Sequence, residues 1–159
     1  MSLNEHVTIM LNSAIDSLKT VLPIPVVVDQ PTLVTAPFNQ ETMSVLIGVT
    51  GNIRGRILFD GDEELFSQVG AAMFGMPISN EMLDSFAGEL GNMIAGNLST
   101  FVSQKGVTID ITPPTVIVGD TKLYGFDKAL RLPVKLENIG TLTVVLMLEL
   151  QKENNTFAV

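Results

Sequence analysis

The sequence contains no cysteine, so disulfides, thiolate nucleophiles and thiolate-bound metals are excluded. It also lacks an apolar run of the roughly 18–20 residues that a membrane-spanning helix needs. Its longest run, Leu142–Leu148, is interrupted by Thr143. A secretory signal peptide begins with positive charge followed by a hydrophobic stretch. The sequence has Glu5 and His6 there instead, so it does not show this pattern. We therefore expect a soluble, cytoplasmic protein that does not enter membranes.

Basic residues are scarce. The chain has 9 Lys and Arg against 17 Asp and Glu, and its formal net charge is −8. A nucleic-acid-binding protein needs a basic surface to displace counterions, so this function is excluded. No Lys or Arg occurs from Ile57 to Gln104, and we expect the acids of that stretch to be solvated or to await a cation on another molecule. These acids are Asp60, Asp62, Glu63, Glu64, Glu81, Asp84 and Glu89.

The length of 159 residues and the hydrophobic content of 46% fit one domain over residues 1–159, with a flexible polar tail at 152–159. Helical spacing predicts a first helix over 4–21. A second helix should start at Asp60-Gly61-Asp62 and stop at Gly75, and a third should run from Ser79 or Asn80 to about Gly106. Strand-like stretches lie at 26–28, 43–50, 54–59, 108–111, 115–118, 129–136 and 141–150.

This element order predicts an α+β fold in which a mostly antiparallel sheet packs against long helices. Gly51-Asn52 is a hairpin signal between two of the strands. A faint internal repeat is also visible, because Asn52-Ile53 with Gly55 opens one strand and Asn138-Ile139-Gly140 opens another.

The third helix has two contrasting sides when its residues are placed about 100° apart. Glu89 and Asn92 leave the polar side together, three residues apart. The apolar side holds Leu83, Ala87, Leu90, Ile94, Leu98 and Phe101, and the polar side holds Ser85, Glu89, Asn92, Gly96, Thr100 and Ser103.

Glycines at 88, 91 and 96 surround this pair, although each interior glycine costs a helix about 1 kcal/mol relative to alanine. One interpretation is that they let a neighbouring helix or strand pack closely. The other is that they clear space beside Glu89 and Asn92 for the backbone of a partner protein.

The segments Gly88–Gly96 and Asp110–Gly119 resemble the CheX branch of the CheC/CheX/FliY family of chemotaxis phosphatases, and so does the first hairpin at Val49–Gly55. The family motif is Asp or Ser, then Glu four residues on, Asn three further on, and Pro about twenty residues later. Ser85, Glu89, Asn92 and Pro114 match it. The resemblance covers nearly all of the chain after about Pro25, and it implies the fold of that family.

The resemblance also implies a function. The family hydrolyses the aspartyl phosphate of the response regulator CheY, which supplies its own magnesium and lysine, so no cofactor is expected in this chain. Asn92 would position the attacking water and Glu89 would pair with the lysine of the regulator. We expect partner contacts from Ser85, Gly88, Met93, Gly96 and Pro114.

Two further expectations follow from the resemblance. Some relatives carry a second Glu-x-x-Asn pair on the first helix. Here the residue three positions after Glu5 is Thr8 and not asparagine, so we expect one site per chain. CheX-type proteins are homodimers joined through their sheets. The alternative function is a non-catalytic module of the same fold that binds a response regulator or serves in a flagellar switch, and the client could also lie outside chemotaxis.

Overall fold

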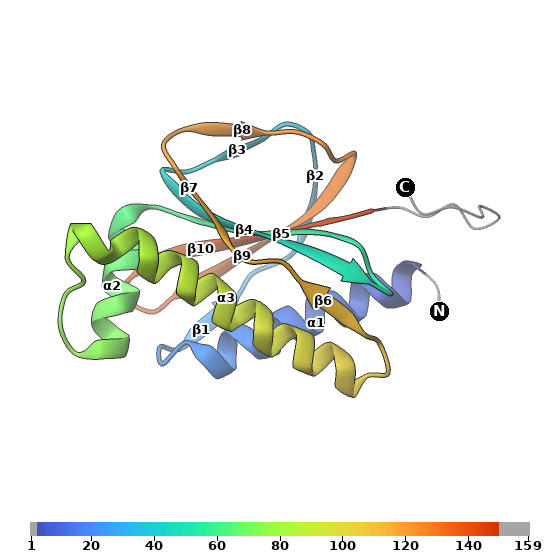
Figure 1. Ribbon diagram of the computed structural model, residues 1–159, viewed down its shortest axis with the longest axis horizontal. Coiled ribbons are helices and arrows are strands. Elements are labelled where there is room, and N and C mark those ends of the chain that lie inside the picture. Colours follow the sequence, from blue (N-terminus) through green and yellow to red (C-terminus); the bar gives the residue numbers. More distant parts are fainter. Residues whose placement is uncertain (1–2, 150–159) are drawn as a thin grey trace.

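The computed structural model describes residues 3–149, and the predicted tail at 152–159 lies outside them. The chain folds into a helical layer, a large antiparallel sheet and a small two-stranded sheet (Figure 1). The helices are α1 (Leu3–Val21), α2 (Glu63–Phe74) and α3 (Asn80–Gln104). The strands are β1 (Val26–Val28), β2 (Thr32–Thr35), β3 (Phe38–Gln40), β4 (Met43–Gly51), β5 (Gly55–Gly61), β6 (Ile109–Ile111), β7 (Thr115–Val118), β8 (Thr121–Leu123), β9 (Lys128–Leu136) and β10 (Gly140–Leu148).

All three predicted helices are confirmed, and so are the residues predicted to start and end α2. The Asp62 side chain caps α2 by accepting a hydrogen bond from the Leu65 N–H at 2.7 Å. Gly75 ends the helix in a left-handed conformation (φ 76°) that glycine adopts without strain. Ser79 precedes α3 as expected, but its side chain makes no capping hydrogen bond.

Three strands are not predicted by the sequence patterns: β2, β3 and β8. Each has only three or four residues, too few for an alternation of apolar and polar positions to stand out. β3 and β8 pair only with each other, and Pro31 and Pro37 border β2 closely. Tertiary pairing therefore determines these strands more than local sequence does.

The main sheet has the order β1-β9-β10-β5-β4-β6, with β2 also paired to β9 and β7 also paired to β4. The apolar strand β10 lies between β9 and β5, so both of its edges are paired and neither is exposed to solvent. The β4–β5 hairpin forms at the predicted Gly51-Asn52 turn. No helix within residues 3–149 combines the length and apolar character that crossing a bilayer requires.

The internal repeat is present in the structure. A helix followed by five strands occurs twice, as α1 with β1–β5 and as α3 with β6–β10, and α2 stands between the two halves. The halves exchange equivalent contacts: Asp29 N–H donates to the Pro133 carbonyl just as Thr112 N–H donates to the Gly48 carbonyl, both at 2.9 Å. Gly55 and Gly140 open the equivalent strands β5 and β10 at φ 153° and 147°.

Two apolar clusters stabilise these layers. The larger lies between the helices and the main sheet, and α1 and α3 run in opposite directions across that face (Figure 1). The smaller cluster fills the space on the opposite face, under β3 and β8. It is built on Phe38, Leu58, Ala129, Val145 and Met147.

Asp60 departs from the prediction that it belongs to an exposed helix start. It is the next-to-last residue of β5 and only 4% exposed. Its Oδ1 accepts hydrogen bonds from the Ser44 hydroxyl at 2.5 Å and from the Glu41 N–H at 2.8 Å. Burial raises the pKa of Asp60 to about 6, and these two hydrogen bonds oppose the rise. The expectation of a solvated carboxylate is therefore wrong for this residue.

Candidate functional site

Helix α3 divides into a buried and an exposed side as its sequence predicts. The predicted apolar side faces the sheet and α1, and only Phe101 of that set remains partly exposed. A hydrogen bond of 2.5 Å from the Ser17 hydroxyl to the Ile94 carbonyl ties α1 to this buried side. These contacts fix the rotation of α3 about its axis, and so they decide which side chains reach the surface.

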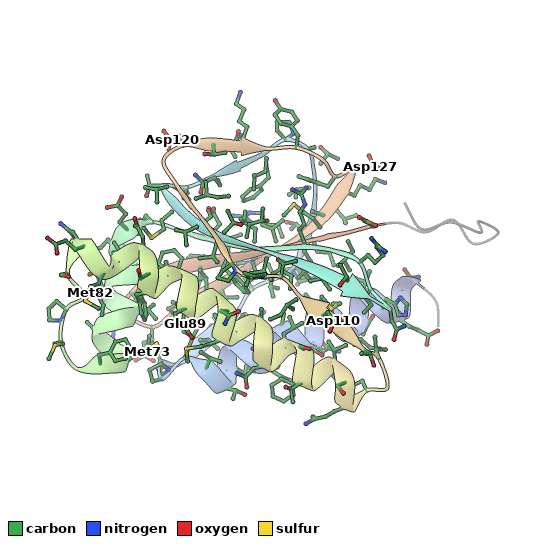
Figure 2. The ribbon with its side chains drawn as sticks, viewed as in Figure 1. Met73, Met82, Glu89, Asp110, Asp120 and Asp127 are labelled. Carbon is green, nitrogen blue, oxygen red and sulfur yellow. The ribbon has the colours of Figure 1, made fainter. Side chains whose placement is uncertain are left out.

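Glu89 and Asn92 lie together on the outer side of α3. Glu89 is exposed and Asn92 is half-buried, about one helical turn apart (Figure 2 labels Glu89). Within residues 3–149, neither the Glu89 carboxylate nor the Asn92 amide forms a hydrogen bond or an ion pair. A carboxylate acceptor and an amide with both donor and acceptor atoms are therefore available to another molecule.

The glycines of α3 have different surroundings. A Cβ atom at Gly91 would lie 2.6 Å from Val45 Cγ1 on β4, and one at Gly88 would lie 3.2 Å from Val116 Cγ2 on β7. These two glycines are buried and allow close packing of the helix on the sheet. Gly96 is half-buried, and no atom lies within 4 Å of the position that its Cβ would take. Gly96 leaves open space on the outer side, whereas Gly88, which we also expect to contact a partner, is buried against β7.

The other residues predicted for the site border the same pair. Ser85 is exposed one turn before Glu89, and Met93 is 37% exposed directly after Asn92. Pro114 is half-buried at the start of β7, with its Cγ 3.9 Å from a Cβ built at Gly88. The strand that follows Pro114 therefore packs beside the helix that carries Glu89 and Asn92.

The internal repeat makes α1 a natural comparison for α3. Met10, Ala14 and Leu18 are buried with the spacing of Ile94, Leu98 and Val102. In the same alignment Glu5 and Thr8 occupy the places of Glu89 and Asn92. Thr8 uses its hydroxyl to donate to the Asn4 carbonyl at 2.8 Å, and it has no amide. The described part of the chain therefore has one Glu-x-x-Asn pair that lies on this surface.

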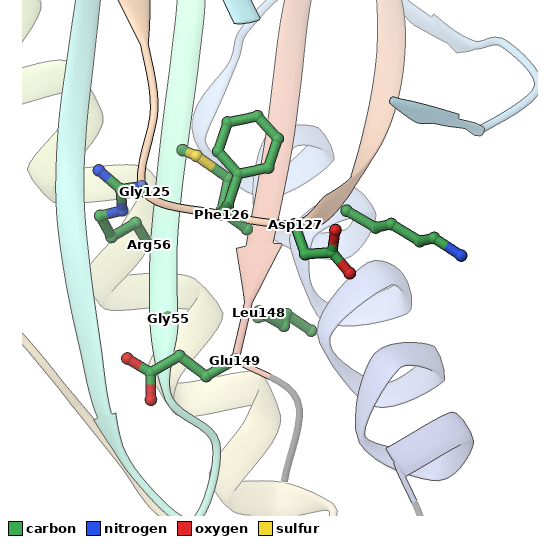
Figure 3. Close-up of a pocket in the computed structure, with 9 residues that line it drawn as sticks. Gly55, Arg56, Gly125, Phe126, Asp127, Leu148 and Glu149 are labelled. Atoms are coloured by element: carbon green, nitrogen blue, oxygen red, sulfur yellow. The ribbon is translucent and has the colours of Figure 1, made fainter. Parts of the chain in front are cut away.

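A separate pocket of about 360 Å³ lies between the start of β5, the segment before β9 and the end of β10 (Figure 3). Arg56, Asp127, Lys128 and Glu149 contribute its charged groups, and Arg56 donates a hydrogen bond to the Tyr124 carbonyl at 2.8 Å. Phe126 and Met147 line it and belong to the smaller apolar cluster. The pocket thus lies across the main sheet from α3 and shares no residue with the Glu89–Asn92 surface.

Comparison with known proteins identifies the family. The family model "Chemotaxis phosphatase CheX" matches residues 43–128, which include α3 and β7. The chain belongs to the CheX family. A curated relative from Thermotoga maritima, "CheY-P phosphatase CheX", is 34% identical over 135 residues, which cover 82% of this chain and 86% of the relative.

Solved structures share the fold of this chain. A chemotaxis protein CheX from Desulfovibrio desulfuricans has a TM-score of 0.75 at 24% identity, covering 91% of this chain and 99% of the other. A CheX–CheY–BeF3–Mg complex from Borrelia burgdorferi has a TM-score of 0.72 at 26% identity, covering 89% and 96%. The predicted α+β fold of the CheX type is confirmed.

Proposed function

We propose that this protein hydrolyses the aspartyl phosphate of a CheY-type response regulator, with Asn92 and Glu89 as its working residues. The observation that carries the proposal is the pair itself: two side chains with complementary chemistry leave one side of α3 without partners among residues 3–149. The proposal is supported by family membership, by the relative named as a CheY-P phosphatase, and by the related complex that contains CheY.

In this mechanism the oxygen of a water molecule attacks phosphorus while the bond from phosphorus to the aspartate oxygen of the regulator breaks. The products are a free aspartate carboxylate and inorganic phosphate. Such a transfer needs the attacking and leaving oxygens in line and the charge on the phosphoryl group neutralised. We propose that the regulator supplies Mg²⁺ and a lysine for the charge, so this chain needs no cofactor of its own and supplies the placement of the water.

Asn92 suits that placement because its amide oxygen accepts a hydrogen bond from the water while its NH₂ group donates to a neighbouring oxygen. Correct orientation alone lowers a reaction barrier by several kcal/mol. Asn92 therefore needs no shifted pKa and no proton transfer of its own. Its half-buried position restricts its rotamers more than full exposure would.

Glu89 is assigned to the lysine of the regulator. The chain has no Lys or Arg from residue 57 to residue 104, so the helix offers Glu89 no cation in its own neighbourhood. The ion pairs of the described residues, Arg54–Glu149 and Lys105–Asp16, do not involve it. Pairing across the interface would orient the regulator and place its phosphoryl group near Asn92.

The direct test uses Asn92→Ala and, as a matched control, Asn97→Ala. Asn97 lies on the same helix, but its amide already donates to the Met93 carbonyl at 3.0 Å. Phosphate release from a CheY-type regulator labelled with radioactive phosphate is followed with each protein. We expect Asn92→Ala to lose at least 100-fold of the acceleration, in line with the positioning contribution. Asn97→Ala should retain it.

Full activity of Asn92→Ala would refute the role of that residue. Binding of the phosphorylated regulator by the parent protein, without any acceleration of phosphate loss, would favour the non-catalytic binding module. Both outcomes come from the same samples, because decay and binding are measured on one regulator preparation.

We also propose that the protein acts in the cytoplasm as a homodimer joined through its sheets. Two exposed apolar side chains on the outer strands support this: Val27 on β1 and Leu33 on β2, which are 64% and 67% exposed. Light scattering should give twice the monomer mass for the parent protein. A monomer at micromolar concentration would count against the dimer without affecting the assignment of Asn92.

A further inference from the structure

A second exposed apolar surface lies beside the site, where α2 turns into α3. Phe74 closes α2, Met76 lies in the turn, and Met82 is on the first turn of α3. They are 59%, 65% and 62% exposed. We call these three residues the α2–α3 shoulder.

The shoulder is continuous with the surface of Glu89 and Asn92. Phe74 packs edge-on against Phe86, with ring centroids 5.8 Å apart, and Phe86 lies on α3 one turn before Glu89. Met82 precedes Glu89 by seven residues, so the two leave the same side of the helix about 10 Å apart along its axis. Figure 2 shows Met82 and Glu89 along α3 in this order.

Helix α2 places the shoulder beside the Glu-x-x-Asn pair. It stands between the two halves of the repeat and packs against α3 and β10. The shoulder therefore borders the helix that carries Glu89 and Asn92. An exposed apolar surface next to this pair indicates a role in the work of the pair.

The charges around the shoulder indicate what covers it. Glu81 and Asp84 flank Met82 on the first turns of α3, and both are exposed. No Lys or Arg of the segment 57–104 offsets them. A complementary surface is apolar at its centre with lysine or arginine at its edge. Methionine side chains adapt their shape readily, which suits a contact that must form and dissociate in each catalytic cycle.

We propose that the α2–α3 shoulder is a docking surface for the CheY-type regulator, and this inference rests on the proposed function. The shoulder receives an apolar patch of the regulator that is flanked by basic side chains and lies on the order of 10 Å from its phosphorylated aspartate. Docking there holds the regulator while Glu89 and Asn92 reach the phosphoryl group. The shoulder therefore contributes to affinity and to the choice of client, and takes no part in bond breaking.

The test compares Met76→Glu and Met82→Glu with Met82→Leu, which keeps the apolar character, and with Tyr124→Glu. Tyr124 is 61% exposed and lies between Leu123 and Phe126, which pack on the smaller apolar cluster across the sheet from α3, so it controls for adding an acid at an exposed apolar position. Thermal unfolding confirms that each variant is folded. Steady-state kinetics then give kcat and KM for phosphate release from the phosphorylated regulator.

We expect Met76→Glu and Met82→Glu to raise KM at least tenfold with kcat unchanged. Met82→Leu and Tyr124→Glu should match the parent. An unchanged KM in both shoulder variants overturns the proposal, and so does an equal rise for Tyr124→Glu. Conversion of a dimer into monomers by the shoulder variants, measured by light scattering, also overturns it, because the shoulder would then contact a second copy.

A binding titration separates this proposal from the proposed function. Regulator held in its activated form by beryllofluoride and Mg²⁺ is titrated with each protein. If the parent protein binds it but does not accelerate phosphate loss, the phosphatase assignment fails. The shoulder is then supported by weaker binding of the two glutamate variants and overturned by equal binding. If the parent protein binds no regulator, the docking proposal is overturned as well.

Discussion

The buried carboxyl of Asp60 predicts an unusual pH dependence of stability. Its pKa is about 6 in the folded protein, against 3.8 for an ordinary aspartate. From pH 4 to pH 6 the folded state therefore holds a proton that the unfolded chain has released, so stability falls as the pH rises. The contribution of the protonated form is complete below pH 4 and is lost as the pH rises through about 6.

The magnitude follows from the difference between the two pKa values. Each pH unit of difference corresponds to 1.36 kcal/mol, so the free energy of unfolding should fall by roughly 3 kcal/mol in total as the pH rises from well below 3.8 to well above 6 on account of Asp60, and by about 2 kcal/mol of this between pH 4.5 and pH 8. That is a substantial part of the 5–15 kcal/mol typical of a small domain. The cost arises because β5 carries the carboxyl into a position that is only 4% exposed.

Urea unfolding of the parent protein and of Asp60→Asn between pH 4.5 and pH 8 isolates this contribution. Asparagine keeps an oxygen that can accept from Ser44 and from the Glu41 N–H, but it cannot ionise. We expect Asp60→Asn to gain stability relative to the parent as the pH rises, and Asp110→Asn, which removes one exposed carboxylate, to follow the parent curve. A difference between parent and Asp60→Asn that is the same at pH 4.5 and pH 8 would refute the reasoning.

Four further predictions concern α2 and α3. Gly91→Ala should destabilise the protein by about 1–3 kcal/mol in urea unfolding, because its Cβ would lie 2.6 Å from Val45 Cγ1. Gly96→Ala has open space and should stabilise it by up to about 1 kcal/mol, yet it should slow phosphate release if the partner backbone approaches there. Asp62→Ala should cost about 1 kcal/mol and Ser79→Ala less, since only Asp62 makes a capping hydrogen bond. Glu89→Lys should bind the activated regulator at least tenfold more weakly than Glu89→Gln; equal affinities would contradict the ion pair.

Local signals in the sequence determine most of the fold. The helices are marked by apolar periodicity and by Asp62 and Gly75, and the long strands by their apolar runs. The short strands β2, β3 and β8 could not be predicted, because their pairing partners lie far away in sequence and their own residues show no alternation. The burial of Asp60 could not be predicted either. Its carboxyl is hydrogen-bonded by Ser44 on β4 and by Glu41 just before β4, and both are distant in sequence.

The exposed side of α3 follows from periodicity, whereas its function does not. Spacing places Glu89 and Asn92 together, but the same spacing occurs on many solvated helices, and the resemblance to a family supplies the chemistry. The roles of the glycines depend on three-dimensional packing. Gly88, Gly91 and Gly96 are identical in sequence terms, yet two face β7 and β4 and one faces open space.

The duplicated architecture bears on why the proposed site lies on one helix. Both halves bury their helices on the same sheet with the same spacing, so packing imposes equal demands on α1 and α3. Packing does not require an amide at the outer position, and Thr8 stands there on α1 while Asn92 stands there on α3. Helix α2 packs against α3 and places its exposed apolar turn beside that helix. In this chain, a client docked on the α2–α3 shoulder would bring its phosphoryl group to α3 and away from α1. The double variant Thr8→Asn/Asn92→Ala should therefore release phosphate at less than one tenth of the parent rate. Recovery of the parent rate would show that the shoulder is dispensable.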